Sequence, residues 1–398
     1  MVAMQDTLQH TLQDFTRRIL HASQTGQPLR LRGGGTKDFL GQALQGEVLD
    51  TRAYSGILSY EPSELVITVR AGTPLAEVEA ALAEKGQSFA FEPPHFSAGR
   101  LDALGEGATI GGMVAAGLSG PSRASVGTVR DFVLGARVIN GKGEHLTFGG
   151  QVMKNVAGYD VSRLLAGSWG QLGLITEVSL KVLPVAPGEA TLVCAGVSQA
   201  QALKLINQWG GQPLPLNASA WVYDTTANPA QDFFFVRLRG AVAAVDAAVT
   251  KMSADVQALG AQVTRMNPQD VADDWHASGE QTLDFFKAQS EHACLWRLSV
   301  PQTAPVLDVR VNGEACAQYI EWHGAQRWLW APASAASQVR EAAVKAGGHA
   351  TLFRTSSAHG DADKQVGVYT PLNDVQQRIQ NELKKQFDPA GIFNPGRA

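Results

Sequence analysis

Hydrophobic residues make up 44% of this 398-residue chain and charged residues 18%, and the formal net charge is -4 at pH 7. These proportions are ordinary for a soluble globular enzyme of two or three domains. The small negative charge and the lack of any Lys/Arg cluster argue against nucleic-acid binding, and no apolar run is long enough to span a membrane.

The start of the chain is predicted to alternate helices and short strands. Apolar residues at helical spacing, from Leu8 to Ile19, predict an amphipathic helix rather than a signal peptide. Strands are expected at Pro28–Leu31 and Leu65–Val69. A helix should follow, with Thr73 as its N-cap and Pro74 in its first position.

Two glycine-rich stretches stand out in the first half: Arg32–Lys37 (RGGGTK), and Ala108–Met113 (ATIGGM) with its continuation to Gly127. Consecutive glycines have no Cβ atoms, so a ligand can approach the backbone, and their N–H groups can form an anion-binding nest. The Thr36 hydroxyl and the charges of Arg32 and Lys37 would suit a pyrophosphate. The alternative is a flexible turn after a strand. Neither stretch has the spacing of a Rossmann fingerprint or a P-loop, which disfavours a nicotinamide or P-loop enzyme.

The middle of the chain contains a predicted hairpin and a predicted domain boundary. Strands at Val133–Ile139 and His145–Phe148 flank the turn sequence Asn140–Gly143. A later strand, from Leu174 to Leu183, ends at Pro184, and the segment from Pro184 to Gly188 breaks both kinds of element. We therefore expect two domains, residues 1–187 and 188–398.

The second half is predicted to be α+β with an antiparallel sheet. Its expected helices are Gln199–Trp209, Val242–Leu259, Ala335–Ala346 and Asp374–Gln386. Its expected strands are Ala220–Tyr223, Phe233–Leu238, Cys294–Val300, Ala317–Trp322 and Gln326–Trp330.

The three cysteines, Cys194, Cys294 and Cys316, form no Cys-x-x-Cys pair. Their expected role is that of small buried hydrophobes. A typical iron–sulfur cluster needs about four grouped thiolates, so this chain should not hold one. Reduced cysteines indicate the cytoplasm as the compartment.

Taken in order, the motifs resemble a known family. The series RGGGT (32–36), AGTPL (71–75), ATIGG (108–112), GTVRD (127–131) and GSWGQLGLIT (167–176) is similar to the FAD-binding domain of the vanillyl-alcohol oxidase and para-cresol methylhydroxylase family. The closing run, Phe387–Arg397, resembles the end of FAD-linked oxidases. This resemblance implies a two-part FAD-binding domain of the para-cresol methylhydroxylase type, followed by an α+β domain with an antiparallel sheet.

Within that family, the runs at 154–160 (KNVAGYD) and 348–354 (GHATLFR) resemble the FAD-binding subunits of bacterial glycolate oxidases. The resemblance implies a complex with a larger flavoprotein subunit and an iron–sulfur subunit, which oxidises glycolate to glyoxylate and passes electrons towards the respiratory chain. Partner subunits would place it at the inner membrane. It also implies noncovalent FAD, because the family's flavin-linking His is replaced by Thr36 and no cysteine precedes Cys194.

By the same resemblance, a set of backbone and side-chain groups would line the FAD: Arg32, Gly33, Gly34, Gly35, Thr36, Lys37, Thr109, Ile110, Gly111, Gly112, Ser119, Gly120, Gly127, Asp131 and Ile175. Two of them have simpler explanations. Asp131 could cap a turn, and Ile175 could belong to the core.

The catalytic residues are not identified by the sequence. Oxidation of a 2-hydroxy acid needs a cationic anchor for the carboxylate and a base for the hydroxyl proton, and His349 and Arg354 are the candidates. His349 could equally be structural. The run at 359–363 (HGDAD) departs from the family's Gly-Asp-Gly-Asn-x-His pattern, so no metal site is predicted and an independent substrate site is disfavoured.

Two other groups of residues have alternative roles. His323 is expected in a hairpin turn, and Trp322, Trp328 and Trp330 form either core packing or a face for a partner. The rival functions are a self-contained FAD-dependent 2-hydroxy-acid or alcohol dehydrogenase, and a structural subunit with a vestigial flavin site.

Overall fold

The computed structural model describes residues 2–97, 107–150 and 160–397, and the chain divides into two compact units. Unit 1 comprises Met1–Ser119, Thr128–Val185 and Pro371–Ala398, and unit 2 comprises Gly120–Gly127 and Ala186–Thr370. This division differs from the expected domains, 1–187 and 188–398, because the C-terminal segment returns to unit 1. The predicted motif at 154–160 lies outside the described residues except for Asp160.

Unit 1 is built on a five-stranded antiparallel sheet with the strand order β3-β4-β8-β6-β7. The strands are β3 (Ile57–Glu61), β4 (Val66–Arg70), β6 (Val133–Ile139), β7 (His145–Gly149) and β8 (Leu174–Lys181). The predicted hairpin, β6–β7, is confirmed. Its turn is closed by Asn140, whose Oδ1 accepts hydrogen bonds from the N–H groups of Lys142 and Glu144, both at 3.0 Å.

Two small pairs of strands and several helices complete unit 1. β1 (Leu29–Arg32) pairs in parallel with β2 (Glu47–Asp50), and β5 (Gln87–Ser88) pairs with β9 (Leu183–Pro184). The helices are α1 (Val2–Thr25), α2 (Leu75–Ala83), α3 (Ile110–Ala116), α5 (Val129–Phe132) and α10 (Asp374–Phe387), with 3-10 turns η1 (Pro62–Glu64) and η2 (Ser162–Leu165).

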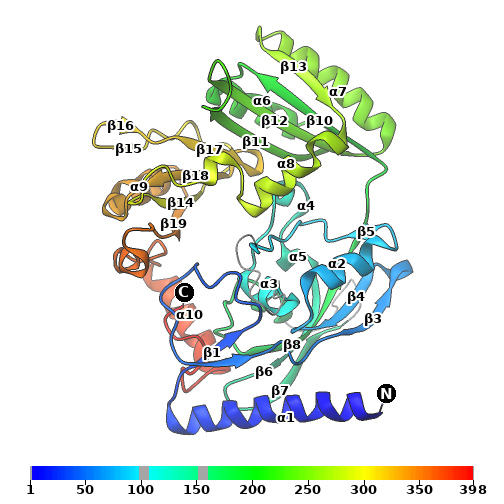
Figure 1. Ribbon diagram of the computed structural model, residues 1–398, viewed down its shortest axis with the longest axis vertical. Helices are drawn as coiled ribbons and strands as arrows, with labels where there is room; N and C mark the ends of the chain where they lie inside the picture. The colour runs from blue at the N-terminus through cyan, green and yellow to red at the C-terminus, as the bar shows by residue number, and fades with distance from the viewer. Residues whose placement is uncertain (1, 98–106, 151–159, 398) are drawn as a thin grey trace. The chain divides into compact units, whose positions relative to one another are not determined.

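The N-terminal helix, α1, is the long blue helix at the bottom of Figure 1. Its Phe15 and Ile19 are buried with Leu29 of β1, and with Ile392 and Phe393 near the C-terminus. The amphipathic spacing therefore predicted its buried face correctly. No helix in the described part of the chain has the length and apolar character needed to cross a bilayer.

The predicted cap of α2 is wrong by one residue. Pro74 is the N-cap, and Thr73 precedes the helix. The buried Thr73 hydroxyl donates to the Arg70 carbonyl at 2.7 Å and accepts from the Gly56 N–H at 2.8 Å. It therefore closes the turn after β4, and is not available to cap the helix.

Unit 2 contains an eight-stranded antiparallel sheet with the order β13-β10-β12-β11-β17-β18-β14-β19. Its strands are β10 (Gly188–Ala195), β11 (Leu216–Asp224), β12 (Gln231–Gly240), β13 (Gln262–Met266), β14 (Cys294–Ser299), β17 (Gln318–Glu321), β18 (Gln326–Ala331) and β19 (His349–Arg354), and β15 (Arg310–Val311) pairs with β16 (Glu314–Ala315) outside this sheet. The helices are α4 (Arg123–Val126), α6 (Gln199–Gly210), α7 (Val242–Gln257), α8 (Pro268–Glu280) and α9 (Ala336–Lys345), and the 3-10 turns are η3 (Asp284–Phe286), η4 (Trp322–Gly324), η5 (Ala333–Ala335) and η6 (Gly360–Val366). The predicted antiparallel sheet is confirmed.

One face of this sheet is apolar and carries the core of unit 2. α6 and α7 pack on it through a cluster that includes Trp209, Phe234 and Met252 (Figure 1). α9 packs through a second cluster that includes Trp296 and Val339. Cys194 and Cys294 lie in these clusters, and burial raises the pKa of each thiol to about 12, which fits the expected role of the cysteines as small buried hydrophobes.

The opposite face of the sheet is mixed polar and aromatic. Arg237 is 2% exposed, and its Nε donates to Asn217 at 2.6 Å while its guanidinium lies over Trp275 of α8. Trp328 is also buried, and it donates to the Glu321 carboxylate at 2.6 Å. The tryptophans of this region are therefore used within unit 2, and core packing is the correct reading for Trp328 rather than a face for a partner.

Candidate functional site

A cavity in unit 1 is lined by both glycine-rich stretches. From the predicted set it is lined by Arg32, Gly33, Gly34, Gly35, Thr36, Lys37, Thr109, Gly111, Gly112 and Ile175. Residues that the sequence did not assign to the site also line it, among them Arg30, Thr51, Trp169, Asn394 and Arg397. The structure thus brings segments from the two ends and the middle of the chain together in one cavity.

The glycines of the first stretch allow the two stretches to touch. A Cβ atom on Gly33 would lie 2.1 Å from the Thr109 hydroxyl, and one on Gly34 would lie 1.9 Å from the Gly107 carbonyl oxygen. Gly35 has a φ of 69°, in the left-handed region that favours glycine. Gly33 and Gly34 are therefore needed for the close packing of the first stretch against the Thr109 side chain and the Gly107 backbone of the second.

The two stretches differ in the N–H groups that they offer. The N–H groups of Ile110 and Gly111 donate to the carbonyls of Thr73 and Ala71 at 3.0 and 2.8 Å. The expectation that the second stretch offers free N–H groups is therefore wrong at these two residues. In the part of the chain that the structure describes, no intramolecular hydrogen bond uses the N–H groups of Gly33, Gly34 or Thr36.

Positive charge surrounds the first loop. Arg30 and Arg32 share the carboxylate of Asp38, with Arg32 Nε at 2.9 Å from Asp38 Oδ2. Lys37 is buried, and its ammonium donates to the Thr36 hydroxyl at 3.2 Å and to the His95 carbonyl at 3.3 Å. Three cations against one carboxylate leave a net positive loop, which favours a multiply charged anion such as a pyrophosphate.

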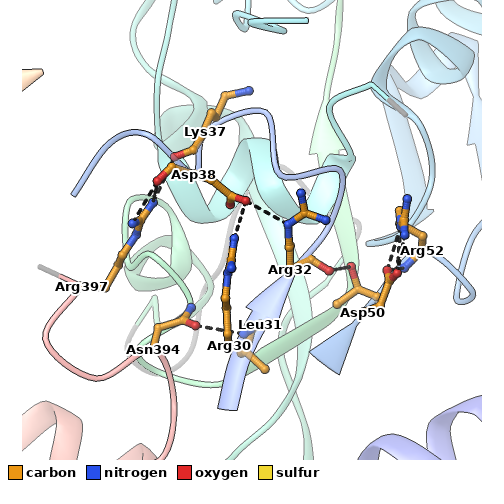
Figure 2. A network of polar contacts seen from close by, with 10 residues as sticks. Arg30, Leu31, Arg32, Lys37, Asp38, Asp50, Arg52, Asn394 and Arg397 are labelled. Atoms are coloured by element: carbon orange, nitrogen blue, oxygen red, sulfur yellow. Dashed lines mark hydrogen bonds and ion pairs between the residues drawn. The ribbon is translucent and has the colours of Figure 1, made fainter. Parts of the chain in front are cut away.

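The C-terminal segment forms the wall behind this loop (Figure 2). The Arg397 guanidinium donates to the carbonyls of Lys37, Asp38 and Gln42. Asn394 accepts from the Leu31 N–H at 2.9 Å. The family-like closing run 387–397 carried the signal for this arrangement, but spacing in the sequence could not say where that run packs.

Five predicted residues do not line the cavity. Ile110 is fully buried in the core, and Ser119 accepts a hydrogen bond from the Val129 N–H at 3.3 Å. Asp131 accepts from the N–H and hydroxyl of Thr128 at 2.8 and 3.0 Å, as a capping residue does. Gly120 and Gly127 belong to unit 2, where they flank α4.

The catalytic candidates, His349 and Arg354, lie at opposite ends of β19. In the pairing with β14, His349 lies opposite Ser299, Thr351 opposite Arg297 and Arg354 opposite Leu295. The register shifts by one residue between Leu295 and Trp296. Because of this shift, the side chains of His349 and Arg354 lie on the same face of the sheet. This is the mixed polar face, and it includes Arg297. Burial and the charge of Arg297 lower the pKa of His349, and burial lowers that of Arg354 to about 10.

Arg297 and Glu321 on this face were missed by the sequence reasoning. Glu321 is 5% exposed, accepts hydrogen bonds from Trp328 and Gln326, and has its pKa raised by burial. Both residues interrupt otherwise apolar strands, and that alternation was the available signal. Asp363 of the run at 359–363 is structural instead: it accepts from Ser356 and Cys294, and although burial alone would raise its pKa, the hydrogen bonds from Ser356 lower it.

Comparison with known proteins identifies relatives of the whole chain. A family model described as an FAD binding domain matches residues 9–149. The glycolate oxidase subunit GlcE of Escherichia coli (strain K12) is 42% identical over 97% of this chain and 96% of its own length. The glycolate oxidase subunit GlcD of Bacillus subtilis (strain 168) is 25% identical over 96% of this chain and 86% of its own length.

A solved structure of alkyldihydroxyacetonephosphate synthase aligns with a TM-score of 0.67 at 15% identity, covering 96% of this chain and 74% of that one. At this identity the likeness concerns the fold alone. Together with the family model, it confirms the predicted fold class, an FAD-binding domain of the para-cresol methylhydroxylase type joined to an α+β domain.

Proposed function

We propose that this chain, which belongs to the same family of FAD-dependent oxidoreductases as the GlcE subunit of E. coli glycolate oxidase, is the FAD-binding subunit of a glycolate-oxidising complex. The observation that carries the proposal is the similarity to GlcE along nearly the whole chain. The cofactor of this family is FAD.

The cavity fits the pyrophosphate of FAD. Gly33, Gly34 and Thr36 have N–H groups that no described intramolecular hydrogen bond uses, and Cβ atoms are missing where the loop passes close to the second stretch. Lys37 holds its ammonium among Thr36, the His95 carbonyl and the Phe96 ring. These groups would bind the two phosphates through backbone donors and neighbouring charge.

Bound FAD would supply the hydride-accepting chemistry that no protein side chain can provide. The chain's own residues would hold and orient the dinucleotide. Electrons would then leave through an iron–sulfur partner, because the three cysteines of this chain are scattered and two of them are buried in apolar clusters. A larger flavoprotein subunit would carry the main oxidation of glycolate to glyoxylate.

One observation favours a second candidate, a self-contained 2-hydroxy-acid dehydrogenase. The mixed polar face of unit 2 gathers His349, Arg354, Arg297 and Glu321. An arginine and a histidine are the groups needed to anchor a carboxylate and to remove a hydroxyl proton. If this face acts on substrate, the isolated chain should oxidise glycolate without a partner.

The test compares the isolated, FAD-loaded chain with the complex purified from the source cell. Dye reduction that depends on glycolate is measured per mole of flavin in both samples. We expect strong reduction by the complex and little by the chain alone. Equal turnover in the two samples would favour the self-contained dehydrogenase. A chain that cannot be loaded with FAD would leave only a structural role.

A further inference from the structure

We propose that Arg397 and Asn394 are positioning residues that hold the glycine loop, Gly33–Lys37, in the conformation that binds FAD. Neither residue belongs to the loop, and neither was expected to serve it. The proposal rests on the role of this loop in FAD binding under the proposed function. It assigns to the C-terminal segment a task within unit 1.

Arg397 forms hydrogen bonds with the backbone at the end of the loop and in the segment that follows it. Its Nη2 donates to the Lys37 carbonyl at 3.0 Å, and its Nη1 donates to the Gln42 carbonyl at 2.9 Å. Both nitrogens also lie 3.3 Å from the Asp38 carbonyl, and the Arg397 carbonyl accepts from the Gln42 N–H at 3.2 Å. The side chain is 5% exposed and packs over Trp169.

Asn394 holds the strand that precedes the loop. Its Oδ1 accepts from the Leu31 N–H at 2.9 Å, its Nδ2 donates to the Trp169 carbonyl at 2.6 Å, and its own N–H donates to the Leu29 carbonyl at 2.9 Å. The segment itself is anchored by Asp388, which accepts from the N–H groups of Ile392 and Phe393. The loop is therefore held at both of its ends (Figure 2).

These contacts fix the orientation of backbone peptide groups, and they do not involve a ligand. The Lys37 carbonyl and the Asp38 N–H belong to one planar peptide and point in opposite directions. Arg397 fixes the carbonyl, and the N–H closes the turn onto the Gly35 carbonyl at 3.1 Å. Three carbonyls can be satisfied together by the flat fork of donors on arginine, whereas lysine offers a single ammonium.

Part of the entropy cost of ordering the loop is therefore met in the free protein, before FAD binds. A loop that samples many conformations must be ordered when the cofactor binds, and that ordering weakens affinity. Removal of the Arg397 fork should therefore loosen residues 33–42 in the free protein and weaken FAD binding, even though other groups contact the phosphates.

The experiment uses the full-length chain with Arg397→Gln and Arg397→Lys. Arg378→Gln is the matched control, because Arg378 is exposed on α10 in the same C-terminal region. Hydrogen exchange is measured on the FAD-free proteins, and the FAD dissociation constant is measured by quenching of flavin fluorescence. We expect faster exchange at residues 33–42 with unchanged exchange in β6 and β8. We also expect FAD binding weaker by roughly tenfold or more, the loss of about one net hydrogen bond, for both Arg397 variants and not for the control.

An FAD dissociation constant within about twofold of the wild type in a folded Arg397→Gln protein would overturn the proposal. So would unchanged exchange at residues 33–42. If Arg397→Gln does not fold, Arg397→Lys keeps the charge and the buried stem, and its dissociation constant decides. A wild-type complex that binds FAD but fails to oxidise glycolate would contradict the proposed function and leave this inference standing.

Discussion

Individual glycines show how far sequence reasoning reached at the residue scale. The run Gly33–Gly35 predicted close approach of a ligand to the backbone, and the structure shows a second reason for these glycines, the close approach of Gly33 and Gly34 to the second glycine-rich stretch. The partner of that approach could not be predicted, because Gly107 and Thr109 are far away in sequence and meet the loop only in the folded unit. The same limit applies to Arg397, whose hydrogen bonds to Lys37 and Asp38 span nearly the whole chain.

We predict that Gly34→Val abolishes FAD binding. A Cβ at this position would lie 1.9 Å from the Gly107 carbonyl oxygen, so the loop must move away from the second stretch. Loss of two charge-assisted N–H contacts of roughly 1.5–3 kcal/mol each would weaken binding about a hundredfold or more. Flavin content after purification, from the visible absorbance, is the measurement.

Gly210→Ala is the matched control for this change. Gly210 ends α6 in unit 2, and an added Cβ meets no atom within 4 Å. Its flavin content should equal that of the wild type. Normal flavin content in Gly34→Val would show that the loop is not the phosphate cradle.

At the scale of elements, the spacing of apolar residues predicted the helices that pack on the sheet. It did not predict where a strand ends at residues with unusual backbone angles. The predicted helices α6, α7 and α9 bury apolar residues that recur at helical spacing, whereas α10, also predicted, has no buried residue. The strand expected to run through Trp322 ends at Glu321, since Trp322 and His323 adopt positive φ values of 54° and 55°. Such values cost energy for residues other than glycine and are set by tertiary contacts, which sequence pattern does not report.

The turn η4 should make unit 2 sensitive to acid. His323 lies between two hydroxyls, with Nε2 at 2.9 Å from Ser125 and Nδ1 at 3.0 Å from Ser219, and burial lowers its pKa to about 4. The unfolded value is about 6.5. Because the folded pKa lies below the unfolded one, stability from the neutral imidazole is present above pH 6.5 and is lost as the pH falls towards 4.

The prediction is a change in the effect of His323→Gln with pH. At pH 7.5 the variant should be less stable than the wild type by about 1–3 kcal/mol, since buried hydroxyls lose their partner. At pH 5 the difference should shrink by about 2 kcal/mol, because the imidazole of the unfolded wild type is protonated at this pH and must lose its proton before it can be buried in the folded protein. Urea unfolding at both pH values measures this, and an equal difference at the two would contradict the low pKa.

For the whole molecule, the two ends of the chain are joined in one site. Leu29 of β1 forms a bridge with Phe393, and both lie in the cluster that receives α1. Sequence resemblance indicated that the start and the end of the chain belong to a flavoprotein. It did not show that the end supports the start, because no local pattern encodes a contact between segments so far apart. The function of the C-terminal run therefore emerges only from the fold.

The last prediction is that the FAD is bound noncovalently. The resemblance to the family implies that Thr36 stands where covalent members have a flavin-linking His, and all three cysteines follow residue 193. Among the described residues that line the cavity of unit 1, none is His or Cys. His95 is close enough for its carbonyl to accept from Lys37, but its imidazole is directed to Glu79 at 2.8 Å. Because the described lining offers neither of these two flavin-linking residue types, we expect hydrogen bonds and charge to retain the cofactor, and both are lost on denaturation. Precipitation in acid should therefore release all of the yellow colour into the supernatant, whereas flavin absorbance that stays in the washed pellet would reveal a covalent link.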